Sequence, residues 1–335
     1  MNIIQMGKKN KKKPTRVSLC TPTFNRRPFI LQMVDNILKQ TYPREYMEWI
    51  ILDDGTDPIG DLVKDIPFIK YIYCEERMSL GKKRNLMHEF CTFKNDNDII
   101  VYIDDDDYYP PERVSHAVET LNKSNALCAG SSEIYLWFNE LNKMYKFGPY
   151  GPNHGTAGTF AFKRIMLKDT HYEDSAVLAE EKFFLKNYTI PFVQLNPLKT
   201  ILVISHEQNT FDKKRLINTN SPVCNDSALV PSTFIKDHNT LHFYTKDIKD
   251  TLKLYVEGDI KNKPNVLAEI KRRDEERSKQ TQQQVVLTQP DGTKRPLQMN
   301  EIIEVLKMKT NENNTLKEKI SEYEQKIKQI LSVIS

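Results

Sequence analysis

Short apolar runs alternate with amphipathic segments through much of the chain. Apolar runs of strand length lie at 17–20, 49–52, 69–74 and 98–103. Apolar residues recur at helical spacing over 28–40, 80–93 and 111–122. One face of the first of these helices would carry Ile30, Leu31, Val34, Ile37 and Leu38. This alternation predicts an α/β fold with a mostly parallel sheet and helices on both faces.

Polar clusters directly follow three of the predicted strands. They read "TPTFNR" at 21–26, "DDG" at 53–55 and "DDDD" at 104–107. In open sheets of this kind, ligands bind beyond the carboxyl ends of the strands, so the three clusters would meet at one edge. One such cluster also suits a turn or a helix cap. Three clusters at equivalent positions predict a ligand site.

The four adjacent aspartates raise a problem of charge repulsion. Neighbouring carboxylates destabilise one another, and a divalent cation such as Mg²⁺ or Mn²⁺ removes the repulsion because it prefers oxygen ligands. Alternate residues of an extended chain point to opposite sides, so Asp104 and Asp106 can serve one ion from the same side. The alternative is a solvated acidic turn before a helix at Pro111. The tetrapeptide by itself leaves both interpretations open.

Charge and cysteine content narrow the class of protein. The net charge of +4 is small for 335 residues and much of it lies in the first sixteen, so a nucleic-acid-binding body is not predicted. We expect residues 1–15 to form a basic, disordered arm. Five cysteines without a CxxC pattern favour a reducing compartment. With no apolar run near the ~20 residues that span a bilayer, we expect a cytoplasmic protein without a transmembrane segment.

The last third of the chain has a different pattern. Residues 226–284 are predicted to form a helical extension or linker, and 285–335 a small hairpin followed by a coiled-coil helix. "PDG" at 290–292 suits the hairpin turn. Steps of three and four then separate Leu306, Lys309, Asn313, Leu316, Ile320, Tyr323, Ile327, Ile330 and Ile334. This heptad spacing predicts a parallel homo-oligomer, a dimer or a trimer, through residues 306–334. The alternative is an amphipathic helix packed on its own domain.

Four motifs in order carry a family resemblance. They are "SLCTPTFNR" at 18–26, "WIILDDGTD" at 49–57, "LGKKRN" at 80–85 and "VYIDDDDYY" at 101–109. In this order and spacing the chain resembles a family-two glycosyltransferase with the GT-A fold, the Rossmann-like fold of nucleotide-diphospho-sugar transferases. The resemblance implies a glycosyltransferase domain at 16–225. The high content of lysine, asparagine and isoleucine also resembles chains from AT-rich genomes, including those of giant DNA viruses.

The resemblance implies an inverting transfer from a nucleotide-diphosphate sugar, which we expect to be a UDP-sugar. The acceptor would be a hydroxyl group of a glycan, a protein or a small molecule. The implied donor-binding residues are Thr21, Pro22, Asp53, Asp54, Arg84, Asp104, Asp105, Lys213 and Arg215. Mn²⁺ or Mg²⁺ would be held by Asp104, Asp106 and His206.

The implied catalytic base is an acidic residue at the start of a helix beyond the aspartate run. In "LAEEKFFLKNY" at 178–188, Glu180 and Glu181 take this place, and Glu181 is the predicted base. It departs from the usual aspartate by one methylene group. Asp174, in "YEDS" at 172–175, ranks second because no apolar helical run directly follows it.

Three other classes of protein remain open at this stage. A phosphohydrolase of the haloacid dehalogenase type also has a strand followed by Asp-x-Asp, but Tyr108 stands where a threonine or valine is expected. A nucleotidyltransferase would need a glycine-rich phosphate loop, which is missing after the first strand. A non-catalytic oligomeric scaffold would not need the acidic residues and the histidine that the chain retains.

Overall fold

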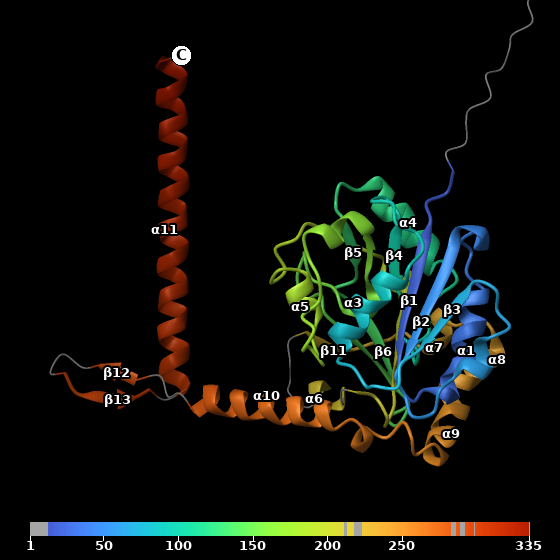
Figure 1. The fold of residues 1–335 in the computed structure, drawn as a ribbon. Coiled ribbons are helices and arrows are strands. Elements are labelled where there is room, and N and C mark those ends of the chain that lie inside the picture. The colour runs from blue at the N-terminus through green and yellow to red at the C-terminus, as the bar shows by residue number, and fades with distance from the viewer. Residues whose placement is uncertain are drawn as a thin grey trace, which may run out of the picture. The chain divides into compact units, whose positions relative to one another are not determined.

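The computed structural model of the chain describes residues 13–210, 213–217, 223–282, 286–288, 292–297 and 299–334. Two compact units divide the chain, Met1–Glu269 and Ile270–Ser335. Figure 1 shows the strands and helices of both units along the chain. Most of the predicted basic arm, residues 1–12, lies outside the described residues.

A seven-stranded sheet forms the centre of the first unit, in the order β3-β2-β1-β4-β8-β5-β9. Its strands are β1 (Val17–Thr23), β2 (Met47–Asp53), β3 (Ile69–Tyr73), β4 (Ile99–Tyr102), β5 (Cys128–Gly130), β8 (Ala161–Lys163) and β9 (Phe192–Gln194). Strand β8 runs antiparallel to both of its neighbours, whereas the other adjacent pairs are parallel. The prediction of a mostly parallel sheet is therefore confirmed.

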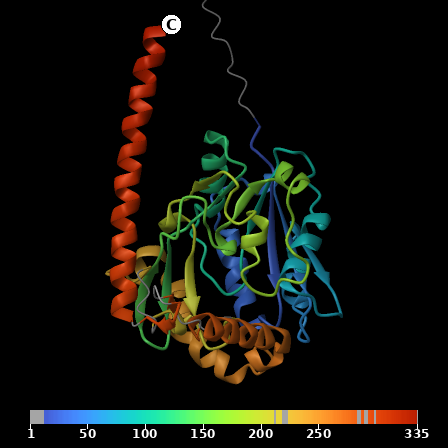
Figure 2. The ribbon, with the colours of Figure 1, turned by 90° about the vertical axis from the view of Figure 1, so that its left-hand side faces the viewer.

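Helices cover both faces of this sheet, as two views at right angles show (Figures 1 and 2). They include α1 (Arg27–Leu38), α2 (Gly60–Val63), α3 (Leu80–Phe90) and α4 (Arg113–Lys123). Successive residues of a strand point to opposite faces. Leu19 of β1 therefore packs in one core cluster with Ile30 of α1, and Cys20 packs in another with Met87 of α3.

The buried face of α1 differs in part from the predicted one. Leu31 is 63% exposed and Leu38 is 38% exposed. The residues that α1 buries are Phe29, Ile30, Met33, Val34, Asn36 and Ile37. Leu31 lies one residue, or about 100°, around the helix from Ile30, so it cannot reach the sheet that Ile30 contacts.

A smaller sheet extends the first unit beyond the aspartate run. Its order is β10-β6-β7-β11, with β6 (Ile134–Phe138), β7 (Lys143–Phe147), β10 (Leu202–Ser205) and β11 (Cys224–Asp226). An isolated bridge between Tyr108 and Leu202 links the end of the aspartate run to β10. The short helices that follow along the chain are α5 (Glu181–Phe184), α6 (Lys214–Ile217), α7 (Pro231–Phe234), α8 (His238–His242) and α9 (Ile248–Leu254).

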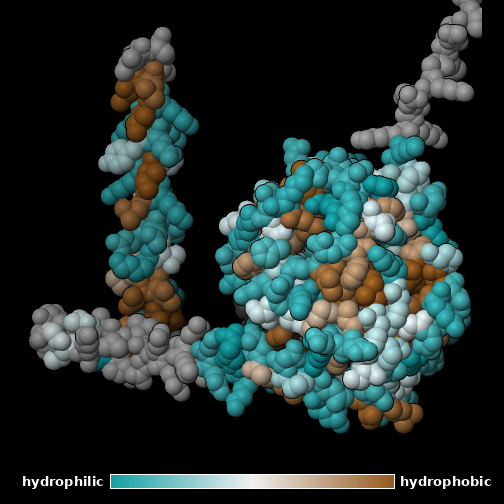
Figure 3. All heavy atoms as spheres, viewed as in Figure 1, coloured by the Kyte–Doolittle hydropathy of each residue, from teal (hydrophilic) through white to brown (hydrophobic). Residues whose placement is uncertain are grey.

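The second unit holds the predicted hairpin positions and the long helix. Strand β12 (Val286–Thr288) pairs antiparallel with β13 (Lys294–Pro296). Helix α10 (Pro264–Gln282) spans the division between the units, and α11 (Met299–Ile334) follows the hairpin. Apolar side chains recur along the exposed surface of α11 (Figure 3). Among the described residues, no helix is both long enough and apolar enough to cross a membrane.

Candidate functional site

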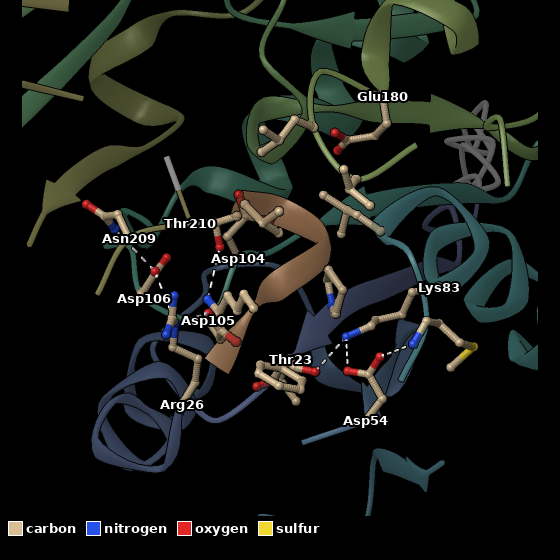
Figure 4. A pocket seen from close by; sticks show the side chains of 18 of the residues that line it. Thr23, Arg26, Asp54, Lys83, Asp104, Asp105, Asp106, Glu180, Asn209 and Thr210 are labelled. Carbon is tan, nitrogen blue, oxygen red and sulfur yellow. Dashed lines mark hydrogen bonds and ion pairs between the residues drawn. The ribbon is translucent and has the colours of Figure 1, made fainter. Parts of the chain in front are cut away.

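The polar clusters that follow β1, β2 and β4 meet at one cavity of about 290 Å³. Figure 4 shows Asp54, Lys83, Asp104, Asp105, Asp106 and Glu180 around this cavity. The cavity lies at the carboxyl ends of parallel strands, where ligands of such sheets bind. Its lining consists of Pro22, Thr23, Phe24, Arg26, Asp54, Arg77, Met78, Leu80, Lys83, Arg84, residues 104–107, residues 177–180, Asn209, Thr210, Lys213, Lys263, Asn265 and Val266.

Each of the four aspartates has a cationic or hydrogen-bonding partner, and Asp105 and Asp106 share Arg26. Asp104 Oδ1 lies 3.7 Å from Arg84 Nη2, and Asp107 Oδ1 accepts a hydrogen bond of 2.8 Å from the backbone N–H of Ile204. Arg26 Nε lies 3.6 Å from Asp105 Oδ1 and 3.3 Å from Asp106 Oδ2. The two arginines and the backbone N–H therefore reduce the mutual repulsion of the four carboxylates.

The carboxylates respond differently to burial. Burial, and then the negative charge of Asp106, raise the pKa of Asp105 to about 7. Burial is also the largest cause that raises the pKa values of Asp104 and Asp107. Burial acts on Asp106 in the same direction, but the hydrogen bond from His206 and the charge of Arg26 outweigh it and lower the pKa of Asp106. Asp106 is therefore the member of the run that stays ionised most firmly.

His206 joins this cluster from the end of β10. Its Nε2 lies 3.2 Å from Asp106 Oδ2 and 2.9 Å from Asn209 Nδ2. The backbone N–H of Gln208 donates to Nδ1 of the ring at 3.3 Å. Burial lowers the pKa of His206 to about 4. At neutral pH the imidazole is therefore uncharged, as a metal ligand must be.

The donor set suits a divalent metal held partly by its substrate. Among the described residues, no three His, Cys, Asp or Glu side chains converge as a complete metal site. Asp106 and His206 are in contact, whereas Asp104 turns toward Arg84. Mg²⁺ sites commonly use only one or two carboxylates, with phosphate and water oxygens as the other ligands. Asp106 and His206 therefore fit such an ion as its protein ligands.

The nucleotide-binding residues expected around β1 and β2 divide into two groups. Pro22 and Asp54 line the cavity. Thr21 lies within β1 and accepts a hydrogen bond of 2.9 Å from Trp49 Nε1. Asp53 accepts from the N–H groups of Gly55 and Ile59 and from the hydroxyl of Tyr71. Neither Thr21 nor Asp53 lines the cavity, so each supports the backbone behind it.

Helix α3 supplies two cations to the cavity. Lys83 forms an ion pair with Asp54 and donates a hydrogen bond of 2.8 Å to the carbonyl of Thr23. Arg84 donates from Nε to Glu180 Oε1 at 2.8 Å, and its guanidinium lies 4.2 Å from the centre of the Tyr102 ring. Within the described part of the chain, Arg84 Nη1 has no hydrogen-bond partner. This buried donor is available to an anion in the cavity.

The three candidate bases occupy different environments. Glu180 lines the cavity and is 4% exposed. Ala179, the residue before Glu180, has a φ of 53°. The backbone is therefore in the left-handed region directly before the carboxylate that lines the cavity. Glu181 begins α5 outside the cavity lining. Asp174 also lies outside it and accepts a hydrogen bond of 2.7 Å from Asn85 Nδ2.

Of the two basic residues predicted to bind the donor after β10, only one lines the cavity. Lys213 lines the cavity, whereas Arg215 is exposed and lies outside the lining.

Sequence reasoning also missed cavity residues. Arg26 lies in the motif "SLCTPTFNR" and Lys83 lies in "LGKKRN". Membership of these motifs is the sequence feature that could have identified both residues. Lys263 follows no predicted strand and belongs to no motif, so no sequence pattern indicates its place in the cavity.

The comparisons with known proteins agree with the motifs. Residues 18–176 match the family model described as glycosyl transferase family 2. No curated protein matches the chain. This match supports the predicted glycosyltransferase class over the phosphohydrolase and nucleotidyltransferase alternatives.

Solved structures are similar at low sequence identity. One is S. aureus TarS 1-349 in complex with UDP-GlcNAc, at 16% identity and a TM-score of 0.43, covering 58% of this chain and 59% of that chain. Another is the mannosyltransferase PcManGT from Pyrobaculum calidifontis in complex with GDP-Man and Mn²⁺. It has 17% identity and a TM-score of 0.46, and the match covers 70% of each chain.

The fold class rests on the elements themselves and on the family match. A mostly parallel central sheet with helices on both faces, followed by a C-terminal helix, agrees with the GT-A expectation, which is confirmed. The matched segment contains β1 to β4, the acidic run and helix α3. Residues 18–176 are therefore similar to the glycosyl transferase family 2 model in both motifs and fold.

Proposed function

We propose that the protein is a metal-dependent, inverting glycosyltransferase that moves a sugar from a nucleotide-diphosphate sugar, a UDP-sugar, to a hydroxyl acceptor. The observation that carries this proposal is the single cavity in which Asp54, Arg84, the aspartate run and Glu180 meet. These residues come from separate elements, so their convergence is a property of the fold. The family match over residues 18–176 supports the same reaction class.

The balance of charge in the cavity supports the metal. Six carboxylates line it, from Asp54, residues 104–107 and Glu180. Six cations face them, from Arg26, Arg77, Lys83, Arg84, Lys213 and Lys263. The diphosphate of a nucleotide sugar would add two negative charges to a lining whose formal charges cancel. A divalent ion bound with it restores the balance, and Asp106 and His206 would be its protein ligands.

The reaction needs proton removal and stabilisation of the leaving group. A carboxylate takes the proton of the acceptor hydroxyl, and the oxygen then forms its bond to the anomeric carbon. The bond between that carbon and the diphosphate breaks, and the electron pair stays on the diphosphate. Arg84 and Lys213 are the cations that would stabilise this charge, and bound Mn²⁺ or Mg²⁺ would contribute as a Lewis acid.

We assign separate tasks to the two adjacent glutamates. Glu181 is the base that the resemblance implies, at the start of α5. Glu180 holds Arg84 through a buried ion pair of 2.8 Å, so we assign it the positioning of that guanidinium. Catalytic groups often reach their working geometry only in the complex with substrate. The position of Glu181 outside the cavity lining is compatible with this assignment.

The experiment is calorimetric titration of the full chain with UDP in the presence and absence of Mn²⁺. We expect Mn²⁺ to strengthen binding in the wild type and to have no effect on Asp106→Ala. Asp35→Ala is the matched control because Asp35 pairs with Lys39 on the exposed face of α1. Equal Mn²⁺ dependence in Asp106→Ala and the wild type would remove Asp106 from the metal site.

We also propose that α11 joins two or more copies of the chain as a parallel coiled coil. Leu316, Ile320, Tyr323, Ile327 and Ile330 on its seam are each at least 50% exposed. With Ile320 and Ile327 at a, the flanking g and e positions hold Glu312, Lys317, Lys319 and Glu324. In a parallel pair in register, each g residue meets the e residue five positions later in the partner. Glu312 would meet the partner's Lys317, and Lys319 the partner's Glu324, so both pairs would be attractive.

A further inference from the structure

One wall of the cavity comes from far outside the family-matched segment. Lys263, Asn265 and Val266 line it, although the match ends at residue 176. They lie where the chain enters α10, and Figure 4 shows this segment beside Thr210. The motifs around β1, β2 and β4 contain no counterpart to this segment.

Hydrogen bonds fasten this wall to the loops of the central sheet. Asn25 Nδ2, at the end of β1, donates to the carbonyl of Glu257 at 2.8 Å. Arg77 Nη1 donates to the carbonyl of Asn262 at 2.9 Å. The hydroxyl of Tyr255 donates to Asp57 Oδ2 at 2.9 Å. Residues 255–266, which we call the wall segment, are therefore held at both ends.

A close contact at Gly258 fixes the middle of the wall segment. A Cβ atom there would lie 2.1 Å from Gln208 Oε1 and 3.2 Å from the carbonyl oxygen of Asn25. Gln208 also donates from Nε2 to the carbonyls of Leu252 and Tyr255. A Cβ atom at this position would force the Gln208 side chain to move, so the wall segment packs directly on the loop that follows His206.

Lys263 is a buried cation without a carboxylate partner. Its residue is 4% exposed, and its Nζ donates a hydrogen bond of 3.1 Å to Thr210 Oγ1. Nζ also lies 5.9 Å from the centre of the Phe24 ring. No ion pair within 4.0 Å joins Lys263 to any of the described carboxylates. An ammonium group has three donors, so two of them remain for a ligand.

Burial of a charge without a partner costs free energy, which an anion in the cavity would recover. Burial, together with the positive charge of Arg26, lowers the pKa of Lys263 to about 7, and the negative charges of Asp105 and Asp106 oppose this shift only in part. This direction agrees with a site that lacks its anion. A structural role alone would be served as well by an apolar side chain packed on Phe24.

We propose that Lys263 binds a phosphate oxygen of the nucleoside diphosphate, and that the wall segment is part of the donor site. This inference rests on the proposed function, because it takes the anion to be the diphosphate of the donor. A hydrogen bond between an ammonium group and a phosphate oxygen is charge-assisted and about twice as strong as a neutral one. The donor site then combines residues from early in the sequence of the first unit, such as Asp54, with residues from near its end, such as Lys263.

The test compares ligands that differ only in phosphate. UDP and uridine are titrated into the full chain with Mn²⁺, using the wild type, Lys263→Gln and Lys261→Gln. Lys261 is the matched control because it is exposed, lies two residues away and pairs with Asp259 at 3.2 Å. For Lys263→Gln we expect UDP to bind about tenfold to a hundredfold more weakly and uridine to bind unchanged. Lys261→Gln should match the wild type for both ligands.

Two further variants distinguish the loss of a ligand contact from a folding defect. Lys263→Met keeps the length of the apolar stem without the charge, and Lys263→Arg keeps the charge. We expect Met to behave like Gln and Arg to restore part of the affinity for UDP. Equal affinity of the wild type and Lys263→Met for UDP overturns the inference, as does an equal loss for UDP and uridine. If the wild type binds neither UDP nor GDP, the proposed donor class itself is wrong.

Discussion

Arg84 lies between two of the acidic side chains at the site, Glu180 and Asp104. It contacts Glu180 through Nε, approaches Asp104 through Nη2 and keeps Nη1 free of any described partner. Tyr102 lies under its guanidinium at 4.2 Å. A guanidinium held on two sides in this way loses little further freedom when it binds a phosphate. The acidic residues around Arg84 therefore have different effects on binding and on turnover.

Substitution of the two glutamates separates these effects. Glu181→Gln should lower turnover by about 10²- to 10⁴-fold while leaving UDP affinity unchanged, because it removes only the base. Glu180→Gln should weaken UDP binding as well, because Arg84 loses the partner that positions it. The measurements are steady-state turnover and calorimetric affinity, with Asp174→Asn as the third variant. The assignment would be wrong if Glu181→Gln kept full activity while Glu180→Gln lost turnover without losing UDP affinity. In that case Glu180 would be the base.

His88 predicts part of the acid sensitivity of the fold. Burial, assisted by the positive charges of Arg164 and Arg84, lowers the pKa of His88 to about 3. The ordinary value is about 6.5, so between these values the unfolded chain holds a proton that the folded chain lacks. Stability therefore falls as the pH falls from 6.5, by about 2 kcal/mol at pH 5 from this residue.

The variant for this test is His88→Gln, which keeps a hydrogen-bonding group near the hydroxyl of Tyr102 and does not titrate. Denaturant unfolding at pH 7 and pH 5 measures the free energy of unfolding of both proteins. We expect the variant to lose less stability than the wild type between the two values. Parallel losses in the two proteins would assign the acid sensitivity to the carboxylates instead.

At the scale of elements, the strand ends were predictable and the short strands were not. The apolar runs before Thr21, Asp53 and Asp104 predict strands whose carboxyl ends meet, because parallel neighbours must end at one edge. Strands β5, β8 and β9 have only three residues each, which is too short for a period-two pattern to emerge. Their pairing depends on contacts between distant segments.

The same reasoning explains which site residues the sequence could indicate. Asp104, Asp106 and Arg84 stand in motifs, and the fold brings them near one cavity. Thr21 and Asp53 stand in the same motifs, but they turn away from the cavity because Trp49 and Tyr71 engage them. The direction in which a side chain points depends on its neighbours in space. Lys263 lies in a loop beyond the smaller sheet, and no local pattern connects it with the cavity.

At the scale of the whole molecule, the proposed coiled coil of α11 would determine how many copies act together. Its seam leaves large apolar side chains exposed in the single chain, and Figure 3 shows them along the helix. Asn313 at one a position favours a single register, and Ile320 and Ile327 at a favour two strands. The attractive pairs at g and e favour the parallel orientation.

Exchange of charges tests this orientation. Lys317→Glu with Glu324→Lys makes both interhelical pairs repulsive without changing the net charge, so we expect dissociation at least about tenfold stronger. Glu318→Lys with Lys328→Glu is the matched control, because these positions lie away from the seam. Light scattering over a concentration series measures the mass of each variant, with a chain ending at Met299 as the monomer reference. An oligomer that survives in the shortened chain would contradict the assignment of the seam.

The wall segment has a consequence for the order in which the protein is made. Asn25 and Glu257 are joined by a hydrogen bond although 232 positions separate them in the sequence. The ribosome delivers the β1 loop early and residues 255–266 much later, so the central sheet can assemble on the nascent chain before its cavity is enclosed. A ribosome-bound chain that stops at the end of the family-matched segment therefore lacks Lys263, Asn265 and Val266. On the proposed assignment, full affinity for the nucleotide would be reached late in biosynthesis, in chains whose synthesis has passed the start of α10.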